Sequence, residues 1–185
     1  MRKLVLLGLL GVLAITAVAL ARPGTPVPVP AGACREPTIH VHKSQGIVEL
    51  RCAGQVRGRF EATFGAHPTG PKERQGDERT PEGRYVVSSK VVSERFYRFL
   101  GISYPNADDR ARAQKLGVDN PGGGIGIHGT RPRRAGLARA WTRVAHATGL
   151  YTVWGPTDGC IALANEDIEV LFDAVAVGTP VEITP

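Results

Sequence analysis

Apolar and polar residues alternate with a period of two over several stretches of the chain, a pattern typical of half-buried β-strands. The clearest case is residues 55–64, where apolar or small residues alternate with charged or hydroxyl-bearing ones. The polar, turn-rich residues 65–83 predict a long loop between strands. The predicted strands, taken along the chain, are residues 38–41, 46–51, 55–64, 84–92, 101–103, 125–127 and 181–183.

Three segments follow helical periodicity instead: residues 107–116, 137–148 and 165–175. The last is the clearest, because Asn165 is a typical N-cap and acidic residues favour the first helical turn. Its apolar residues recur every three to four positions and form one stripe that can pack on a sheet. The members of this stripe are Ile168, Leu171, Phe172 and Val175. The pattern as a whole predicts a mainly β domain with a few short helices.

The start of the chain has a different pattern. After a short basic segment, residues 4–20 form an uncharged, apolar run that ends near a small-x-small cleavage sequence. Residues 1–21 therefore predict a secretory signal peptide or, if uncleaved, a membrane anchor. The proline-rich residues 22–33 predict an extended linker, which leaves residues 34–185 as one domain. We expect this domain to be exported to the periplasm or cell envelope, and to stay at the inner membrane if the anchor is retained.

The formal net charge of the chain is +6, and 6% of its residues are aromatic. A modest positive balance favours anionic partners such as wall polymers or membrane surfaces, although an ordinary solvated surface is the simpler explanation. The charge is too small, and the aromatic residues are too few, to predict a nucleic-acid partner.

The three cysteines predict one disulfide and one free thiol. Cys34 and Cys52 flank the first predicted hairpin, and an oxidising compartment would join them. A zinc site made of these cysteines with His40 and His42 is an alternative, but its spacing matches none of the usual zinc motifs, so no metal is expected. Cys160 is left over, and an exported protein that keeps a free thiol usually needs it for chemistry or for an intermolecular bond.

Cys160 and His128 form the candidate catalytic pair. Cysteine attacks as a thiolate, and a nearby histidine can take its proton or hold it as an ion pair. The two residues are far apart in the sequence, so they meet only if the fold brings two strand ends together. Gly129 and Gly159 suit such a close approach, and N–H groups around Gly159 and Cys160 can form an oxyanion hole. The alternative is a buried structural cysteine beside a core histidine.

Residues 124–129 spell the G-x-G-x-x-G pattern of a dinucleotide site. Such a site needs a strand before the glycines and a helix that starts at them. These glycines follow a turn and lead into a predicted strand, so we expect no cofactor.

Several motifs stand out along the chain: Gly76 to Tyr85 (GDERTPEGRY), Ile102 to Asn106 (ISYPN), Pro121 to Gly123 (PGG), Ile127 to Gly129 (IHG) and Thr157 to Ala162 (TDGCIA). In this order they resemble the L,D-transpeptidase catalytic domain, the YkuD-like family, over nearly all of the domain. The last motif resembles the branch usually named murein L,D-transpeptidase. The resemblance implies a mainly β, sandwich or barrel-like catalytic domain with a few short helices and no metal or cofactor.

The resemblance also implies a cysteine-dependent L,D-transpeptidase that acts on peptidoglycan stem peptides through a thioester acyl-enzyme. The acyl group would pass to water or to an amine acceptor, which is a second stem peptide, a D-amino acid or a lipoprotein lysine. Two alternatives stay open: a hydrolase of the same family that cleaves peptidoglycan peptide or lipoprotein–peptidoglycan bonds, and a non-catalytic wall-binding domain. The implied residues are Cys160 as nucleophile, His128 as general base and acid, Gly159 as an oxyanion-hole backbone donor, Asp158 as the backbone carbonyl that orients His128, and Thr157, Gly129 and Tyr104 as substrate contacts.

Two positions depart from the commoner family pattern, S/T-H-G-C-x-R. Asp158 replaces a histidine, and Ala162 replaces an arginine that would contact the substrate carboxylate. Either another basic residue supplies that contact or the substrate differs. The long segment before Cys160 carries basic residues that form either a lid over the cleft or a solvated surface. These are Arg131, Arg133, Arg134, Arg139 and Arg143, and His146 is a second but less suitable candidate base.

Overall fold

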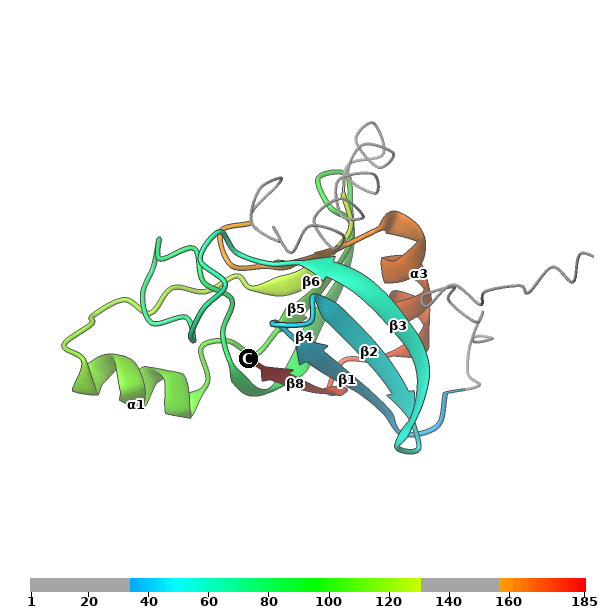
Figure 1. Cartoon of the computed structure of the whole chain (residues 1–185), viewed down its shortest axis with the longest axis horizontal. Helices are drawn as coiled ribbons and strands as arrows, with labels where there is room; N and C mark the ends of the chain where they lie inside the picture. Colours follow the sequence, from blue (N-terminus) through cyan, green and yellow to red (C-terminus); the bar gives the residue numbers. More distant parts are fainter. Residues whose placement is uncertain (1–33, 131–156) are drawn as a thin grey trace, which may run out of the picture.

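Eight strands close into a barrel in the computed structural model, which describes residues 34–130 and 157–185 (Figure 1). The strands are β1 (Pro37–His42), β2 (Ile47–Cys52), β3 (Gln55–Thr63), β4 (Gly83–Ser93), β5 (Tyr97–Ile102), β6 (Gly126–His128), β7 (Ile161–Leu163) and β8 (Pro180–Thr184). Their order around the barrel is β1-β2-β3-β7-β6-β5-β4-β8. The described helices are α1 (Ala107–Lys115) and α3 (Asn165–Ala174). The predicted fold class is confirmed, whereas the predicted helix 137–148 lies outside the described residues.

The hairpin of β1 and β2 shows how the alternating pattern builds the barrel. Its antiparallel register pairs Ile39 with Leu50 and Val41 with Val48, and all four side chains are fully buried. Because side chains alternate across a strand, one face of the hairpin fills the barrel while the other faces outward. Strand β8 completes this side by pairing parallel to β1 and antiparallel to β4.

Strand β3 departs from its predicted alternation near its start. Val56 is 42% exposed, although the alternation groups it with the buried Phe60. The register of β2 with β3 explains the difference, because Leu50 pairs with Gly58 but Arg51 pairs with Val56. One residue of β3 is left without a partner at this point, and such a bulge changes the face on which the neighbouring side chains lie.

Helix α3 packs on β5 and β6 and buries Ile168 and Leu171 completely. The prediction of Asn165 as its N-cap is wrong, because the N-cap position is Ala164, which makes no side-chain cap hydrogen bond. The Asn165 Oδ1 instead accepts the N–H of Thr130 at 2.7 Å. The side chain therefore satisfies a backbone donor just after β6 and ties the helix to that strand end.

Helix α1 begins with a capping box, in which Asn106 and Asp109 each accept the other's backbone N–H at 3.0 Å. The buried Asp109 carboxylate also accepts the hydroxyl hydrogen of Tyr85 on β4 at 3.1 Å. The same residue thus starts the helix and fastens it to the barrel.

The long loop between β3 and β4 is built around the buried charge of Asp77. Its carboxylate accepts backbone N–H groups from Glu73, Arg74 and Arg79 and lies 2.6 Å from Lys72 Nζ. Burial alone would raise the pKa of Asp77, but the hydrogen bonds from Lys72 and the backbone lower it to about 2. Hydrogen bonds and an ion pair within the loop therefore hold the segment that its polarity predicts to be a loop. This loop forms one wall of the site described below.

A disulfide joins Cys34 and Cys52, whose Cα atoms lie 5.1 Å apart at the base of the β1–β2 hairpin. With both thiols used, the alternative zinc site loses two of its four ligands. His40 and His42 instead lie near carboxylates of neighbouring strands, at 3.4 and 3.7 Å.

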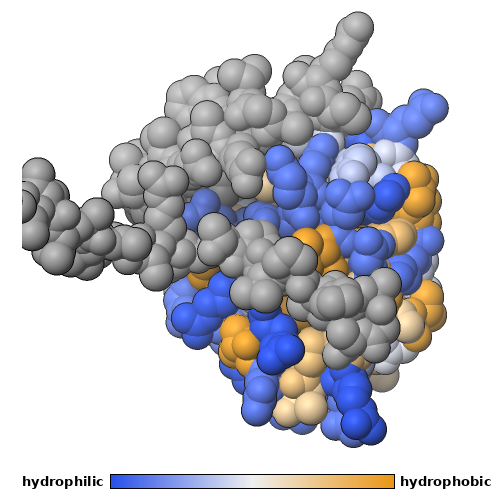
Figure 2. All heavy atoms as spheres, turned by 90° about the vertical axis from the view of Figure 1, so that its right-hand side faces the viewer, coloured by the Kyte–Doolittle hydropathy of each residue, from blue (hydrophilic) through white to orange (hydrophobic). Residues whose placement is uncertain are grey.

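On the face shown in Figure 2, hydrophobic residues are interspersed among hydrophilic ones. Within residues 34–130 and 157–185, no helix is both long enough and apolar enough to cross a bilayer. The predicted signal peptide or anchor, residues 1–21, and the predicted linker, residues 22–33, lie outside this part of the chain.

Candidate active site

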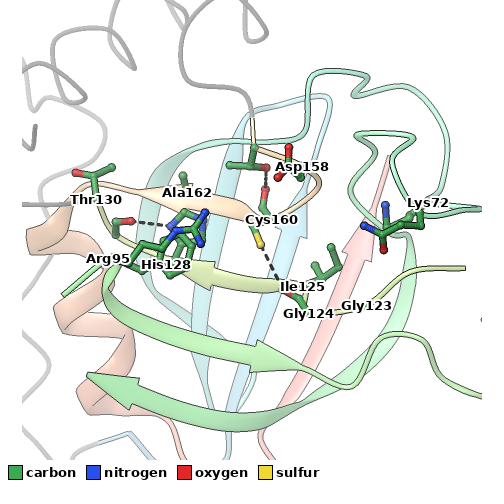
Figure 3. A pocket seen from close by; sticks show the side chains of 14 residues that line it. Lys72, Arg95, Gly123, Gly124, Ile125, His128, Thr130, Asp158, Cys160 and Ala162 are labelled. Carbon is green, nitrogen blue, oxygen red and sulfur yellow. Dashed lines mark hydrogen bonds between the residues drawn. The ribbon is translucent and has the colours of Figure 1, made fainter. Parts of the chain in front are cut away.

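Parallel pairing of β6 with β7 brings the two candidate catalytic residues together. Ile127 pairs with Ile161, and His128 pairs with Ala162. His128 therefore ends β6 close to the point where Cys160 leads into β7. The predicted meeting of two strand ends is present, and both side chains line one pocket (Figure 3).

The pocket has a volume of about 620 Å³ and is walled by separate parts of the chain. The β3–β4 loop supplies Lys72, and the turn between β4 and β5 supplies Arg95 and Phe96. Gly124 lies just before β6, and Asp158 lies in the turn before β7. A concave site of this size suits a small ligand or a short peptide segment.

His128 is only 6% exposed and is held in one tautomer. Its Nδ1 lies 2.6 Å from the Gly129 carbonyl oxygen, which only accepts hydrogen bonds, so Nδ1 carries the proton. Burial lowers the pKa of His128, and the charge of Arg95 lowers it further, although the Gly129 hydrogen bond acts in the opposite direction. The imidazole is therefore neutral at pH 7, and its Nε2 can act as a base.

The carbonyl that orients His128 thus belongs to Gly129, and not to Asp158 as predicted. Gly129 directly follows β6, so its own carbonyl is the acceptor nearest to Nδ1. A Cβ at Gly129 would lie 2.5 Å from Asn165 Oδ1 and 3.0 Å from Ile168 Cγ2. Close packing of helix α3 therefore requires glycine at the position that orients the imidazole.

The Cys160 thiol is neutral at pH 7. It lies 3.7 Å from the Gly124 carbonyl oxygen, which accepts its S–H. Burial raises the pKa of Cys160 and the Asp158 charge raises it further, while a hydrogen bond with the Gly126 backbone and the charges of Lys72 and Arg95 only partly offset this. Because an ordinary thiol already titrates above pH 7, the resting pair is an imidazole and a thiol, not an ion pair.

Hydrogen bonds within the turn hold Cys160 in place. The Thr157 hydroxyl donates to the Cys160 carbonyl at 2.5 Å and accepts the Gly159 N–H at 3.1 Å. Gly159 has a φ of +123°, and a Cβ there would collide with the Arg79 carbonyl, so only glycine fits. The Gly159 N–H has an acceptor in this structure, and the predicted oxyanion role requires it to leave Thr157.

The predicted substrate contacts separate into two groups. Thr157 and Gly129 line the pocket, but Tyr104 does not. The Tyr104 side chain is 6% exposed, and its hydroxyl donates to the Pro121 carbonyl at 2.8 Å. Burial draws it into the core, where it anchors the segment that leads to Gly124. Tyr104 therefore supports the pocket wall and does not face a ligand in the pocket.

Sequence reasoning missed Arg95 and Phe96. They lie in the turn between β4 and β5, and no local motif marks them. Their place beside His128 follows from the pairing of β5 with β6, in which Phe99 lies opposite His128. The Phe96 ring packs against the imidazole at a centroid distance of 4.4 Å.

The remaining predictions concern metals, cofactors and a lid. Among the described residues, no group of three His, Cys, Asp or Glu is placed to hold a metal ion. The glycines of residues 124–129 lead into β6 and not into a helix, so they lack the context of a dinucleotide site. The basic residues of the predicted lid and His146 fall within residues 131–156, outside the described part of the chain.

The family model of the L,D-transpeptidase catalytic domain, YkuD, matches residues 36–183. The chain belongs to this family. YqjB of Bacillus subtilis, an L,D-transpeptidase by name, is 27% identical over 152 residues that cover 80% of this chain and 72% of that protein. YafK of Escherichia coli K12, which carries the same kind of name, is 48% identical over 44 residues that cover 23% of this chain and 18% of that protein.

Solved structures share the fold of this L,D-transpeptidase domain. The helical cell shape determining protein Pgp2 from Campylobacter jejuni has a TM-score of 0.56 at 21% identity, covering 81% of this chain and 48% of that chain. An L,D-transpeptidase from Xylanimonas cellulosilytica has a TM-score of 0.50 at 14% identity, covering 88% of this chain and 64% of that chain. The chain thus spans about half the length of Pgp2, and the likeness at these identities concerns the fold alone.

Proposed function

We propose that the protein is a cysteine-dependent L,D-transpeptidase that acts on peptidoglycan stem peptides through a thioester on Cys160. The observation that carries this proposal is the β6–β7 pairing, which brings a free thiol and a buried, neutral imidazole into one pocket. A nucleophile, a base and a group that orients the base are the parts that cysteine-dependent acyl transfer needs. Family membership supplies the substrate class.

In the proposed acylation, the Cys160 thiol gives its proton to Nε2 of His128 while the sulfur attacks the carbonyl carbon of the third stem residue. The carbonyl oxygen becomes an oxyanion, stabilised by backbone N–H groups of the Gly159–Cys160 turn. The Gly129 carbonyl stabilises the imidazolium that forms. The imidazolium then protonates the leaving amine as the C–N bond breaks, which leaves a thioester and a neutral imidazole.

The second step resolves the thioester. His128 takes a proton from an incoming amine or water, which attacks the thioester carbonyl and returns the sulfur of Cys160 to a thiol. The acceptor would be a second stem peptide, a D-amino acid or a lipoprotein lysine, and water in the same place makes the protein a hydrolase. The exposed Asp158 carboxylate at the pocket suits an ammonium group, so we place transfer ahead of hydrolysis. We also place the reaction outside the cytoplasm, in the periplasm or cell envelope.

Acylation by a carbapenem tests the nucleophile. We expect intact-mass spectrometry to show one drug adduct on the wild-type protein and none on Cys160→Ala, with peptide mapping that assigns the adduct to Cys160. Iodoacetamide labelling of the same preparation reports whether the thiol is accessible. A thiol that iodoacetamide labels but that the carbapenem leaves unmodified would contradict the mechanism.

Incubation with purified wall fragments separates the candidate functions. New cross-links or newly attached amino acids that depend on Cys160 identify a transferase. Released peptides or lipoprotein alone identify the hydrolase, and retention of fragments with unchanged chemistry identifies a wall-binding domain.

A further inference from the structure

We propose that Arg95 binds a carboxylate of the donor stem peptide beside the reacting carbonyl, in the space left by the small side chain of Ala162. This inference rests on the proposed function, because it assumes a peptide donor in the pocket of Cys160. The residue that it assigns to substrate specificity, Arg95, lies outside all the family-like motifs named in the sequence analysis.

The turn between β4 and β5 holds Arg95 against Phe96, the residue that packs on His128. The Ser93 hydroxyl oxygen accepts the N–H groups of both Arg95 and Phe96 at 3.2 Å, which fixes the turn. The guanidinium lies over the Phe96 ring, 4.9 Å from its centroid, and the same ring packs against His128 at 4.4 Å. Arg95 is therefore positioned through Phe96 relative to the imidazole that does the proton transfer.

The two cations that line the pocket differ in whether they have a partner. Lys72 is buried, and its Nζ lies 2.6 Å from Asp77 and 3.2 Å from a backbone carbonyl oxygen. Arg95 is exposed, and among the described residues no carboxylate oxygen lies within 4 Å of its guanidinium. Arg95 is thus the cation of this pocket that is available to an anionic ligand.

The pairing of β6 with β7 leaves a space near Arg95, beside the small side chain of Ala162. Ala162 lines the pocket and pairs with His128 across the β6–β7 ladder, so its methyl group leaves space next to the imidazole. Figure 3 shows Arg95 beside His128, with Ala162 on the adjacent strand. The Arg95 charge lowers the pKa of both His128 and Cys160, as expected for a cation close to both reacting groups. A planar guanidinium here can hold a carboxylate through two parallel hydrogen bonds.

A tetrapeptide stem offers carboxylates from two sources near the bond that breaks. One belongs to the C-terminal residue that leaves, and the other is the side-chain carboxylate of the third residue when that residue is an amino diacid. Peptides in which either carboxylate is replaced by an amide distinguish them, because an Arg–carboxylate contact disappears only when the bound group is the one amidated.

The test measures binding on the Cys160→Ala background, so that turnover does not intervene. NMR titration gives the Kd of the acid tetrapeptide and of the two amides with Arg95 present, with Arg95→Gln and with Arg95→Lys. Arg57→Gln removes the same charge from an exposed position on β3 and is the matched control. Circular dichroism of each variant confirms that it is folded.

We expect Arg95→Gln to weaken binding of the acid peptide about 10- to 100-fold, with partial recovery in Arg95→Lys and no comparable change in Arg57→Gln. One amide should bind with the same Kd whether Arg95 is present or replaced in Arg95→Gln, and that amide identifies the carboxylate. Equal losses in Arg95→Gln and Arg57→Gln, sensitivity of both amides to Arg95→Gln, or no binding of the acid peptide would overturn the inference. Arg95-dependent binding without any turnover by the wild-type protein would support this inference while the proposed function fails.

Discussion

The outer side of the β1–β2–β3 sheet and the exposed edge of the pocket lined by His128 and Cys160 differ in how their charges are paired. On the sheet, Glu49 is nearly buried and accepts hydrogen bonds from Arg51 and Arg59 at 2.7 and 2.8 Å. In the pocket, Arg95 and Asp158 have no oppositely charged partner within 4 Å among the described residues. The sheet thus pairs its charges within the protein, whereas Arg95 and Asp158, unlike the buried Lys72, keep theirs exposed at the pocket.

The pKa shifts of the buried titratable groups also differ between these two regions. Burial alone would raise the pKa of Glu49, but the two arginines outweigh it and hold the pKa below its usual range. Burial dominates in the pocket, where it lowers the pKa of His128 and raises that of Cys160. The sheet thus stabilises a charged form, while the pocket favours the neutral forms of both His128 and Cys160.

The largest expected effect comes from replacing His128, the proposed base in the pocket. We expect His128→Gln to slow acylation of Cys160 about 10²- to 10⁴-fold, because a glutamine cannot take the thiol proton. In the wild-type protein the acylation rate should rise with pH around a midpoint below 6.5, since the lowered pKa of His128 makes the imidazole neutral above that point. Stopped-flow acylation between pH 4 and 8 checks both. A rising limb with an unchanged midpoint in His128→Gln would show that another group is the base.

The second largest effect should be a loss of stability when the end of β6 is crowded. Gly129→Ala puts a Cβ 2.5 Å from Asn165 Oδ1, and we expect a loss of about 1–3 kcal/mol in the free energy of unfolding. Gly123→Ala is the matched control, because its Cβ would meet its nearest neighbour at 3.9 Å. Urea denaturation of both variants measures the difference. Equal stabilities would mean that α3 does not press on the end of β6.

Removing a paired charge from the sheet should have a smaller effect. We expect Glu49→Gln to destabilise the protein by about 1 kcal/mol at neutral pH, discounted for the exposure of Arg51 and Arg59. Because the folded pKa of Glu49 is lowered, this contribution is present above the unfolded pKa and is lost as pH falls through the folded one. The difference in Tm between the two proteins should therefore shrink below about pH 4. A difference that stays constant from pH 7 to pH 2 would contradict the pairing.

The smallest expected effect is on the thiol itself. Asp158→Asn removes a negative charge that raises the pKa of Cys160, so the pH profile of iodoacetamide labelling should move to lower pH. Asp108→Asn on α1 removes the same charge outside the pocket and should leave the profile in place. A profile that moves equally in both variants would assign the shift to net charge instead of to the pocket.

Much of the barrel follows from local pattern, and the failures have physical causes. The hairpin that carries Ile39 and Leu50 was predictable because burial on one face sets the register of a strand pair. Alternation alone puts Val56 on the wrong face, because a bulge depends on the partner strand. Asn165 was predicted to cap its own helix, but a backbone donor from another part of the chain takes its side chain.

The candidate site was predictable only in its motif residues. His128 and Cys160 stand out as a histidine and an unpaired thiol beside glycines, and their motifs resemble a known family. Arg95 has no such signal, because the pairing of β5 with β6 alone brings its turn to the pocket. Tyr104 belongs to a matching motif, yet burial places it in the core behind the pocket wall.

Acid quenching of the reaction with a tetrapeptide stem, followed by intact-mass spectrometry and peptide mapping, tests the central claim most directly. The neutral His128–Cys160 pair predicts a tripeptidyl thioester on Cys160 that forms in the wild-type protein, is absent in Cys160→Ala and accumulates far more slowly in His128→Gln. Product that forms at the wild-type rate in Cys160→Ala, or an acyl group mapped to another residue, would contradict it.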